Sequence, residues 1–157
     1  MSKDIEIHEN KILMLKNVLS KTIIVDENFE KKPFELRVKE FQDYILNNSL
    51  DGFGPLIIKN TIIGGEERKV EIVLLRQLRN ESVKAIYPYG FIKELKTPPC
   101  LFSRFTGQEA NSGFAGLKMQ VYAYENDLVL DIESYTISQN INDNFQMDTF
   151  IPIIGRC

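Results

Sequence analysis

The feature that most constrains the fold is an order of elements that occurs twice along the 157 residues. Each half reads as a strand, an amphipathic helix and two further strands. Extended runs are expected at residues 12–25, 56–63, 69–78, 100–107, 131–138 and 145–154. One helix cannot cover its half of the strands alone, so two equivalent halves should pack about a pseudo-twofold axis. This predicts an α+β fold with one curved antiparallel sheet, two helices on one face, and a groove on the other face.

Two helices follow from the spacing of apolar residues. Pro33 suits the first turn of a helix, because its missing N–H would be unpaired there. Apolar residues then recur at steps of three and four, at Phe34, Val38, Phe41 and Ile45. The second helix has the same spacing at Phe114, Leu117, Val121, Tyr124 and Leu128. Such spacing lines one side of a helix, and we expect both apolar sides to pack in the core.

The length of the chain, and the lack of a linker or low-complexity segment in its sequence, indicate one domain. We expect a flexible N-terminal segment at residues 1–11 and a single domain over 12–155, with halves at about 12–78 and 98–155. The pair Gly64-Gly65 predicts a hairpin turn, since it lacks the glycine spacing of a phosphate-binding loop. Between the halves we expect a strand fragment and a connection, because Pro88 interrupts an otherwise apolar and aromatic run.

Composition narrows the possible functions. The net charge is −3 and no Lys/Arg-rich run occurs, so direct nucleic-acid binding is not expected. The first residues do not resemble a secretory signal, and the apolar runs are too short to span a bilayer, so a cytoplasmic location is expected. His8 is the only histidine, and the two cysteines, Cys100 and Cys157, form no ligand cluster. We therefore expect neither a metal site nor a cofactor, and no Cys–His or Ser–His catalytic pair.

Two carboxylates stand out as candidate binding residues. Alternation along a strand places Asp148 on the same face as Phe150, and Glu71 on the same face as Val73. Acids beside large apolar residues can line the wall of a groove, but they can equally be solvated acids on a sheet. Two carboxylates can act as general acid and base. No other catalytic group supports such chemistry here, so the chain is not expected to be an enzyme.

Aromatic residues are the other candidates, because they are enriched at binding surfaces. Three of them, Tyr87, Tyr89 and Phe91, lie in the irregular middle segment, where partner contact and core packing are both open interpretations. The candidate binding residues are Glu71, Tyr87, Tyr89, Phe91, Phe105, Tyr135, Asp148 and Phe150.

The tandem layout over residues 12–154 resembles the bacterial effector-binding domain, also called the GyrI-like or SOUL-like fold. The resemblance is carried by Phe105-Thr106-Gly107 and by Asp148-Thr149-Phe150-Ile151-Pro152-Ile153. In that family a glutamate at the position of Asp148 often faces the ligand, and Glu71 occupies the equivalent place in the first half. The resemblance therefore implies a pocket for a small-molecule effector, although aspartate is one methylene shorter than the family's glutamate.

A narrower resemblance is to stand-alone members encoded beside type VII secretion toxins in Gram-positive bacteria, the EsaE-like chaperone group. It implies a non-catalytic adaptor that binds the N-terminal region of a secreted nuclease toxin and delivers it to the secretion ATPase. The absence of the family glutamate and of tryptophan favours this adaptor function over a small-molecule pocket. The alternatives are a sensor of small molecules or drugs, and a protein that modulates DNA gyrase.

Overall fold

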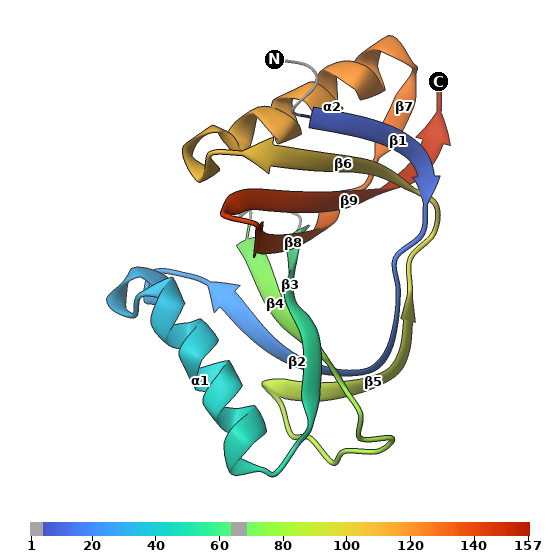
Figure 1. Ribbon diagram of the computed structural model, residues 1–157. Coiled ribbons are helices and arrows are strands. Elements are labelled where there is room, and N and C mark those ends of the chain that lie inside the picture. Colours follow the sequence, from blue (N-terminus) through green and yellow to red (C-terminus); the bar gives the residue numbers. More distant parts are fainter. Residues whose placement is uncertain (1–4, 64–68) are drawn as a thin grey trace. The chain divides into compact units, whose positions relative to one another are not determined.

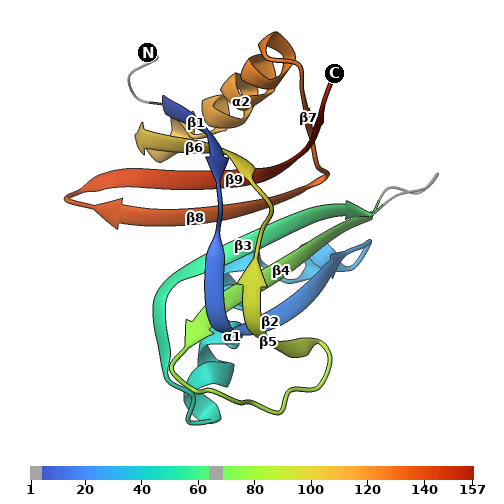
Figure 2. The same ribbon diagram turned by 90° about the vertical axis from the view of Figure 1, so that its right-hand side faces the viewer.

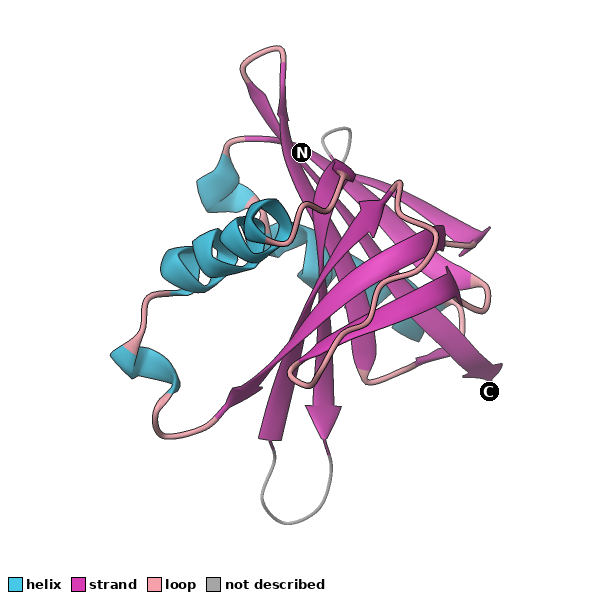
Figure 3. Ribbon diagram, turned by 90° about the horizontal axis from the view of Figure 1, so that it is seen from below, coloured by secondary structure: helices cyan, strands magenta, loops and turns pink. Residues whose placement is uncertain are grey.

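The computed structural model describes residues 5–63 and 69–157, and the chain forms two compact units. Unit 1 combines the chain up to Leu13 with Lys96–Cys157, and unit 2 is Met14–Leu95. Most of the regular structure is strand (Figure 3). Each unit contains one long helix. The predicted α+β class, with antiparallel strands and two helices, is confirmed. Residues 12–78, the predicted first half, fall mainly in unit 2, whereas residues 98–155 lie in unit 1.

Unit 2 is built around α1 (Phe34–Asn47). Its strands are β2 (Met14–Val25), β3 (Gly52–Ile63), β4 (Lys69–Leu78) and β5 (Tyr89–Lys96), and a short 3-10 turn covers Phe29–Lys31. The strands follow one another in the order β3-β4-β2-β5, with β4 antiparallel to both of its neighbours. Phe41 and Ile45 of α1 are buried against Leu19, Ile23, Leu74 and Leu78. The predicted apolar side of this helix is confirmed.

Unit 1 contains α2 (Gly113–Glu125) and the remaining strands, seen in Figures 1 and 2. They are β1 (Ile5–Lys11), β6 (Cys100–Gly107), β7 (Leu128–Leu130), β8 (Glu133–Ile141) and β9 (Asn144–Arg156), and a 3-10 turn at Glu109–Asn111 precedes α2. The order is β1-β6-β9-β8, and β7 pairs with the end of β9. One face of β6 and β9 packs against α2 through Leu101, Ile151 and Ile153.

The expectation of a flexible N-terminal segment is wrong for residues 5–11, which form β1. This strand pairs antiparallel with β6, with Ile5 opposite Phe105 and His8 opposite Phe102. Ile5 and Ile7 alternate with polar residues and pack into unit 1. The partner strand lies about a hundred residues later in the chain, so short-range sequence patterns contain no sign of the pairing. The next strand begins at Met14 rather than at Ile12.

The apolar side predicted for the second helix is also wrong for four of its five residues. Phe114, Leu117, Val121 and Tyr124 are exposed, and α2 ends at Glu125, before the buried Leu128. The side that packs on the strands consists of Ala115, Met119 and Ala123. Small alanines let the helix backbone lie close to the strands, and this packing places the larger side chains on the opposite side.

The predicted Gly64-Gly65 turn lies outside the described residues. No helix in the described part of the chain is long and apolar enough to cross a membrane. Within residues 5–63 and 69–157, no group of three His, Cys, Asp or Glu side chains is placed to hold a metal ion.

Candidate functional site

The face of unit 1 that lies opposite α2 carries two rows of side chains across β1, β6, β9 and β8. The pairing register fixes both rows, because residues directly opposite each other in antiparallel strands project to the same face. The first, here called the aromatic row, is His8, Phe102, Phe150 and Tyr135. The second, here called the ionic row, is Glu6, Arg104, Asp148 and Ile137.

The ionic row is centred on a bidentate pair between Arg104 and Asp148. The guanidinium donates from Nε to Oδ1 and from Nη2 to Oδ2, both at 2.9 Å. The Asp148 side chain is mostly buried, whereas that of Arg104 is more exposed. The hydrogen bonds to Asp148 raise the pKa of Arg104 above its ordinary value, and the charge of Glu6 acts in the same direction. The two hydrogen bonds fix the guanidinium of Arg104 against the carboxylate of Asp148.

In the aromatic row, the rings of His8, Phe102 and Phe150 lie close to one another. Phe102 and Phe150 lie 4.9 Å apart between ring centroids, tilted by 58°, and the His8 ring stacks 6.1 Å from Phe102. Two cations lie over the Phe102 ring, with Lys11 Nζ at 5.8 Å and the Arg104 guanidinium at 5.7 Å from its centroid. Rings in such arrangements attract cations and other rings through their quadrupoles. Phe102 already has two cations beside it.

Three of the predicted site residues, Tyr135, Asp148 and Phe150, come together in these rows. Tyr135 lies directly opposite Phe150, and Asp148 lies two residues before Phe150 on the same face. Their predicted role in binding stays a prediction. The structure adds that the Asp148 carboxylate is already occupied by Arg104.

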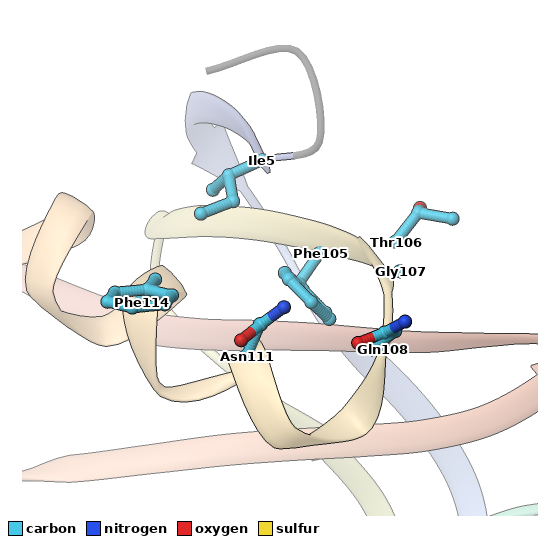
Figure 4. A pocket seen from close by; sticks show the side chains of 7 residues that line it. All are labelled: Ile5, Phe105, Thr106, Gly107, Gln108, Asn111 and Phe114. Atoms are coloured by element: carbon cyan, nitrogen blue, oxygen red, sulfur yellow. The ribbon is translucent and has the colours of Figure 1, made fainter. Parts of the chain in front are cut away.

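Phe105, also predicted as a site residue, lies on the α2 face of β6 instead. It is buried with Ile5 and Ala115, and its ring lies 6.3 Å from that of Phe145. Its edge reaches a pocket of about 370 Å³. Figure 4 shows this pocket, whose lining residues are Ile5, Phe105, Thr106, Gly107, Gln108, Asn111 and Phe114. Phe105 is buried in the core beneath α2, and the aromatic row lies on the opposite face of the strands.

The other four predicted residues belong to unit 2. Tyr89 stacks on Tyr44 of α1, with ring centroids 3.7 Å apart, and Phe91 packs against the α1 core. Desolvation raises the pKa of Tyr89. Tyr87 is exposed, and Glu71 lies in β4 between Ile24 of β2 and Thr61 of β3. For Tyr89 and Phe91, which the sequence left open, the structure therefore shows core packing.

Cys100 is the one buried thiol among the described residues. It begins β6 and contacts the Thr97 hydroxyl at 3.4 Å. Burial raises the pKa of this thiol, and the nearby charge of Glu133 raises it further, while the contact with Thr97 lowers it in part. Because the thiolate is the reactive form, this environment favours an unreactive thiol.

His8, Phe102 and Arg104 were not predicted as site residues. A signal for two of them was present: Phe102 and Arg104 alternate with Leu101, Ser103 and Phe105 along β6, so they had to share the face opposite Phe105. The signal for His8 was short, because alternation in the N-terminal segment is limited to Ile5 and Ile7.

No family model and no curated protein matches this sequence. Solved structures do share its fold. The C-terminal domain of EcmrR has a TM-score of 0.62 at 11% identity, over 95% of this chain and 96% of that domain. SAV2435 bound to tetraphenylphosphonium has a TM-score of 0.55 at 8% identity, over 96% of this chain and 94% of SAV2435. The fold is GyrI-like.

Two further similarities agree with this fold. EcmrR in its complex with DNA has a TM-score of 0.65 at 11% identity, over 96% of this chain. This chain spans only 57% of that EcmrR chain. An integron cassette protein of Vibrio cholerae has a TM-score of 0.51 at 8% identity, with 96% of each chain covered. These similarities extend to the fold alone, and the narrower likeness to type VII secretion chaperones stays a prediction.

Proposed function

We propose that this chain is a non-catalytic binding domain that holds a small aromatic molecule on the aromatic row of unit 1. The observation that carries the proposal is the continuous set of rings His8, Phe102, Phe150 and Tyr135 beside a neutralised ion pair. Phe102 and Tyr135 are buried, so the stacking area open to a ligand comes from the exposed ring of His8 and the half-buried ring of Phe150. A structural neighbour, SAV2435, has been solved bound to an aromatic cation, tetraphenylphosphonium.

The ionic row indicates which aromatic molecules should bind best. An organic cation would meet Asp148 already paired with Arg104, and it would also meet Lys11 over the Phe102 ring. Glu6 is the other carboxylate in the row, and it lies opposite Arg104. We therefore expect neutral aromatic compounds to bind at least as tightly as cations of the same shape.

Isothermal titration calorimetry with tetraphenylphosphonium and neutral triphenylphosphine oxide tests this function. Phe150→Ala should weaken both interactions at least tenfold, whereas Phe114→Ala, which changes a phenylalanine on the opposite side of unit 1, should leave them unchanged. Arg104→Gln should free the Asp148 carboxylate and raise the affinity for the cation relative to the neutral compound. Equal effects of Phe150→Ala and Phe114→Ala, or no binding of either compound, would count against the aromatic row.

Two features support the non-catalytic part of the proposal. Both oxygens of the Asp148 carboxylate accept hydrogen bonds from Arg104, so the carboxylate is already engaged within the chain. Cys100 is buried with a raised pKa, which disfavours a nucleophilic thiolate.

Protein binding, the adaptor function implied by the narrower resemblance, is a second candidate. The observation that favours it is the exposed apolar side of α2. A toxin of a type VII secretion system as the client, and a cytoplasmic site of action, remain predictions from that resemblance. Co-expression with the N-terminal region of such a toxin tests the prediction that a toxin is the client. A stoichiometric complex on gel filtration would support it, and two separate proteins would contradict it.

A further inference from the structure

Helix α2 presents a stripe of large apolar side chains to solvent. The stripe residues and their exposed fractions are Phe114 at 59%, Leu117 at 59%, Val121 at 55% and Tyr124 at 86%. They follow one another at steps of three, four and three, the spacing at which one helix packs against another. In Figure 1, α2 lies along one side of the unit 1 strands. Ala115, Met119 and Ala123 face those strands, and at about 100° per residue the stripe falls on the opposite side.

Both sides of α2 are therefore apolar. Polar side chains between Gly113 and Glu125 are few, and the central ones are Lys118 and Gln120. A helix that is apolar all round is normally buried on all sides. A continuous exposed apolar patch is also rare on a protein that has no partner, and it marks interaction surfaces. The stripe thus has the character of a contact surface.

The charges around the stripe are acidic. Glu125 closes α2, Asp127 follows it, and Glu109 lies just before the helix. The C-terminal end of a helix carries about half a negative charge, so the two acids there add to it rather than neutralise it. None of the three acids forms an ion pair within the described residues. The nearby cations are engaged, since Lys118 donates to the Ile5 carbonyl at 2.8 Å and Arg156 pairs with Glu9.

We propose that the stripe binds an amphipathic helix of another protein, with apolar residues on one side and Lys or Arg along its flanks. A second copy of this chain fits less well, because antiparallel helices would bring Glu109 to the acids of the other copy, and parallel helices would pair identical acids. An anionic membrane is disfavoured by the same acids. The proposal deepens the protein-binding candidate and is independent of the aromatic row, which lies on the other face of the same strands.

The test uses the full chain and two synthetic helical peptides of about three heptads. Both carry leucine at the a and d positions, and their flanking positions are either lysine or glutamate. Fluorescence anisotropy should show that the lysine peptide binds at least tenfold more tightly, and that its affinity falls as salt is raised. Leu117→Gln with Val121→Gln should abolish this binding, whereas the control Leu46→Gln, an exposed leucine on α1, should not. Glu125→Lys with Asp127→Lys should reverse the preference between the two peptides.

The possible results distinguish binding of a protein at the stripe from the preference for a basic partner. If both peptides bind equally and Leu117→Gln with Val121→Gln abolishes this binding, the stripe is a protein-binding surface. The proposal that its partner is basic is then overturned. Binding of neither peptide would overturn protein binding at this surface. Analytical ultracentrifugation could instead show that the unaltered chain is a dimer and that Leu117→Gln with Val121→Gln makes it a monomer. That result would assign the stripe to a second copy of the chain and overturn the proposal. Stronger binding to phosphatidylglycerol vesicles than to the lysine peptide would overturn it as well.

Discussion

The Arg104–Asp148 pair is the strongest single interaction on the candidate site, because it is bidentate and its carboxylate is mostly buried. Arg104→Gln leaves that carboxylate without its partner and should lower the free energy of unfolding by about 1–2 kcal/mol, an amount already reduced for the exposure of Arg104. Asp148→Asn should cost a similar amount. The double variant should cost less than the sum, because no charge is then left unpaired. Urea unfolding measures all three values.

The exposed pair Lys39–Asp43 on α1 is a control, since its atoms lie at a similar distance of 3.0 Å. Removal of either partner there should change the free energy of unfolding by about 0.5 kcal/mol or less. Equal costs at the two pairs would mean that burial of Asp148 adds nothing.

Cys100 provides a prediction for pH. Burial raises the pKa of its thiol in the folded chain, so the unfolded chain loses this proton first as the pH rises. Stability linked to Cys100 should be complete below the ordinary thiol pKa of about 8.5 and should fall as the pH rises from there towards the raised pKa of the folded chain. Unfolding measured from pH 7 to pH 10 should show this fall, and Cys100→Ala should reduce it. An identical slope in the variant would exclude Cys100 as its source.

Residue-level features of the site were only partly predictable. Alternation correctly placed Asp148 and Phe150 on one face, because that rule depends on adjacent residues alone. The pairing of Asp148 with Arg104 depends on the register between β6 and β9, which lie about forty residues apart. Long-range register is set by the whole unit, and short segments of sequence do not contain it.

At the scale of elements, substitutions on the two sides of α2 show which side stabilises the fold. The side chain of Met119, on the packed side of α2, is fully buried, so Met119→Ala should lower the free energy of unfolding by about 2–4 kcal/mol. Val121 is exposed, and Val121→Ala should change stability by about 0.5 kcal/mol or less. Thermal or urea unfolding of both variants checks the assignment. A large loss for Val121→Ala would mean that the stripe is buried in the folded chain.

The two helices also show when apolar spacing predicts packing correctly. In α1 the apolar residues that recur at steps of three and four lie on one side, so the spacing of Phe34, Val38, Phe41 and Ile45 identified the side that packs. In α2 both sides are apolar, and the larger residues dominate the pattern. The side that packs is nevertheless the one with alanines, because small side chains fit close to a strand surface. Spacing alone could not separate these two cases.

For the molecule as a whole, β1 should be essential to unit 1 although it is short. Glu9 accepts hydrogen bonds from the Tyr122 hydroxyl and from Arg156, both at 2.6 Å, and these lower the pKa of Glu9. Deletion of residues 1–11 would remove these bonds, the pairing with β6 and the packing of Ile5 and Ile7. We expect amide protection in β6 and β9 to fall by orders of magnitude in hydrogen exchange, while β2 and β4 keep theirs. Unchanged protection in β6 would show that β1 is dispensable.

The α+β class and most strands could be predicted, because apolar alternation and helix spacing are properties of short segments. The division of the chain could not. β1 joins unit 1 only through contacts with β6, α2 and β9, all of which lie beyond Lys96. The predicted halves are consecutive in the chain, whereas unit 1 is assembled from the two ends of the chain.

That division has a consequence for the order in which the protein takes shape on the ribosome. Every residue of unit 2 has been synthesised by the time Leu95 is added, whereas β1, made first, has no strand to pair with until β6 follows. Leu13 and Thr97 then bond to each other across 84 positions, through Leu13 N–H to the Thr97 hydroxyl and Thr97 N–H to the Leu13 carbonyl. A nascent chain stalled before β6 should thus hold a finished unit 2 beside an unpaired strand, which is the form most open to capture by a chaperone.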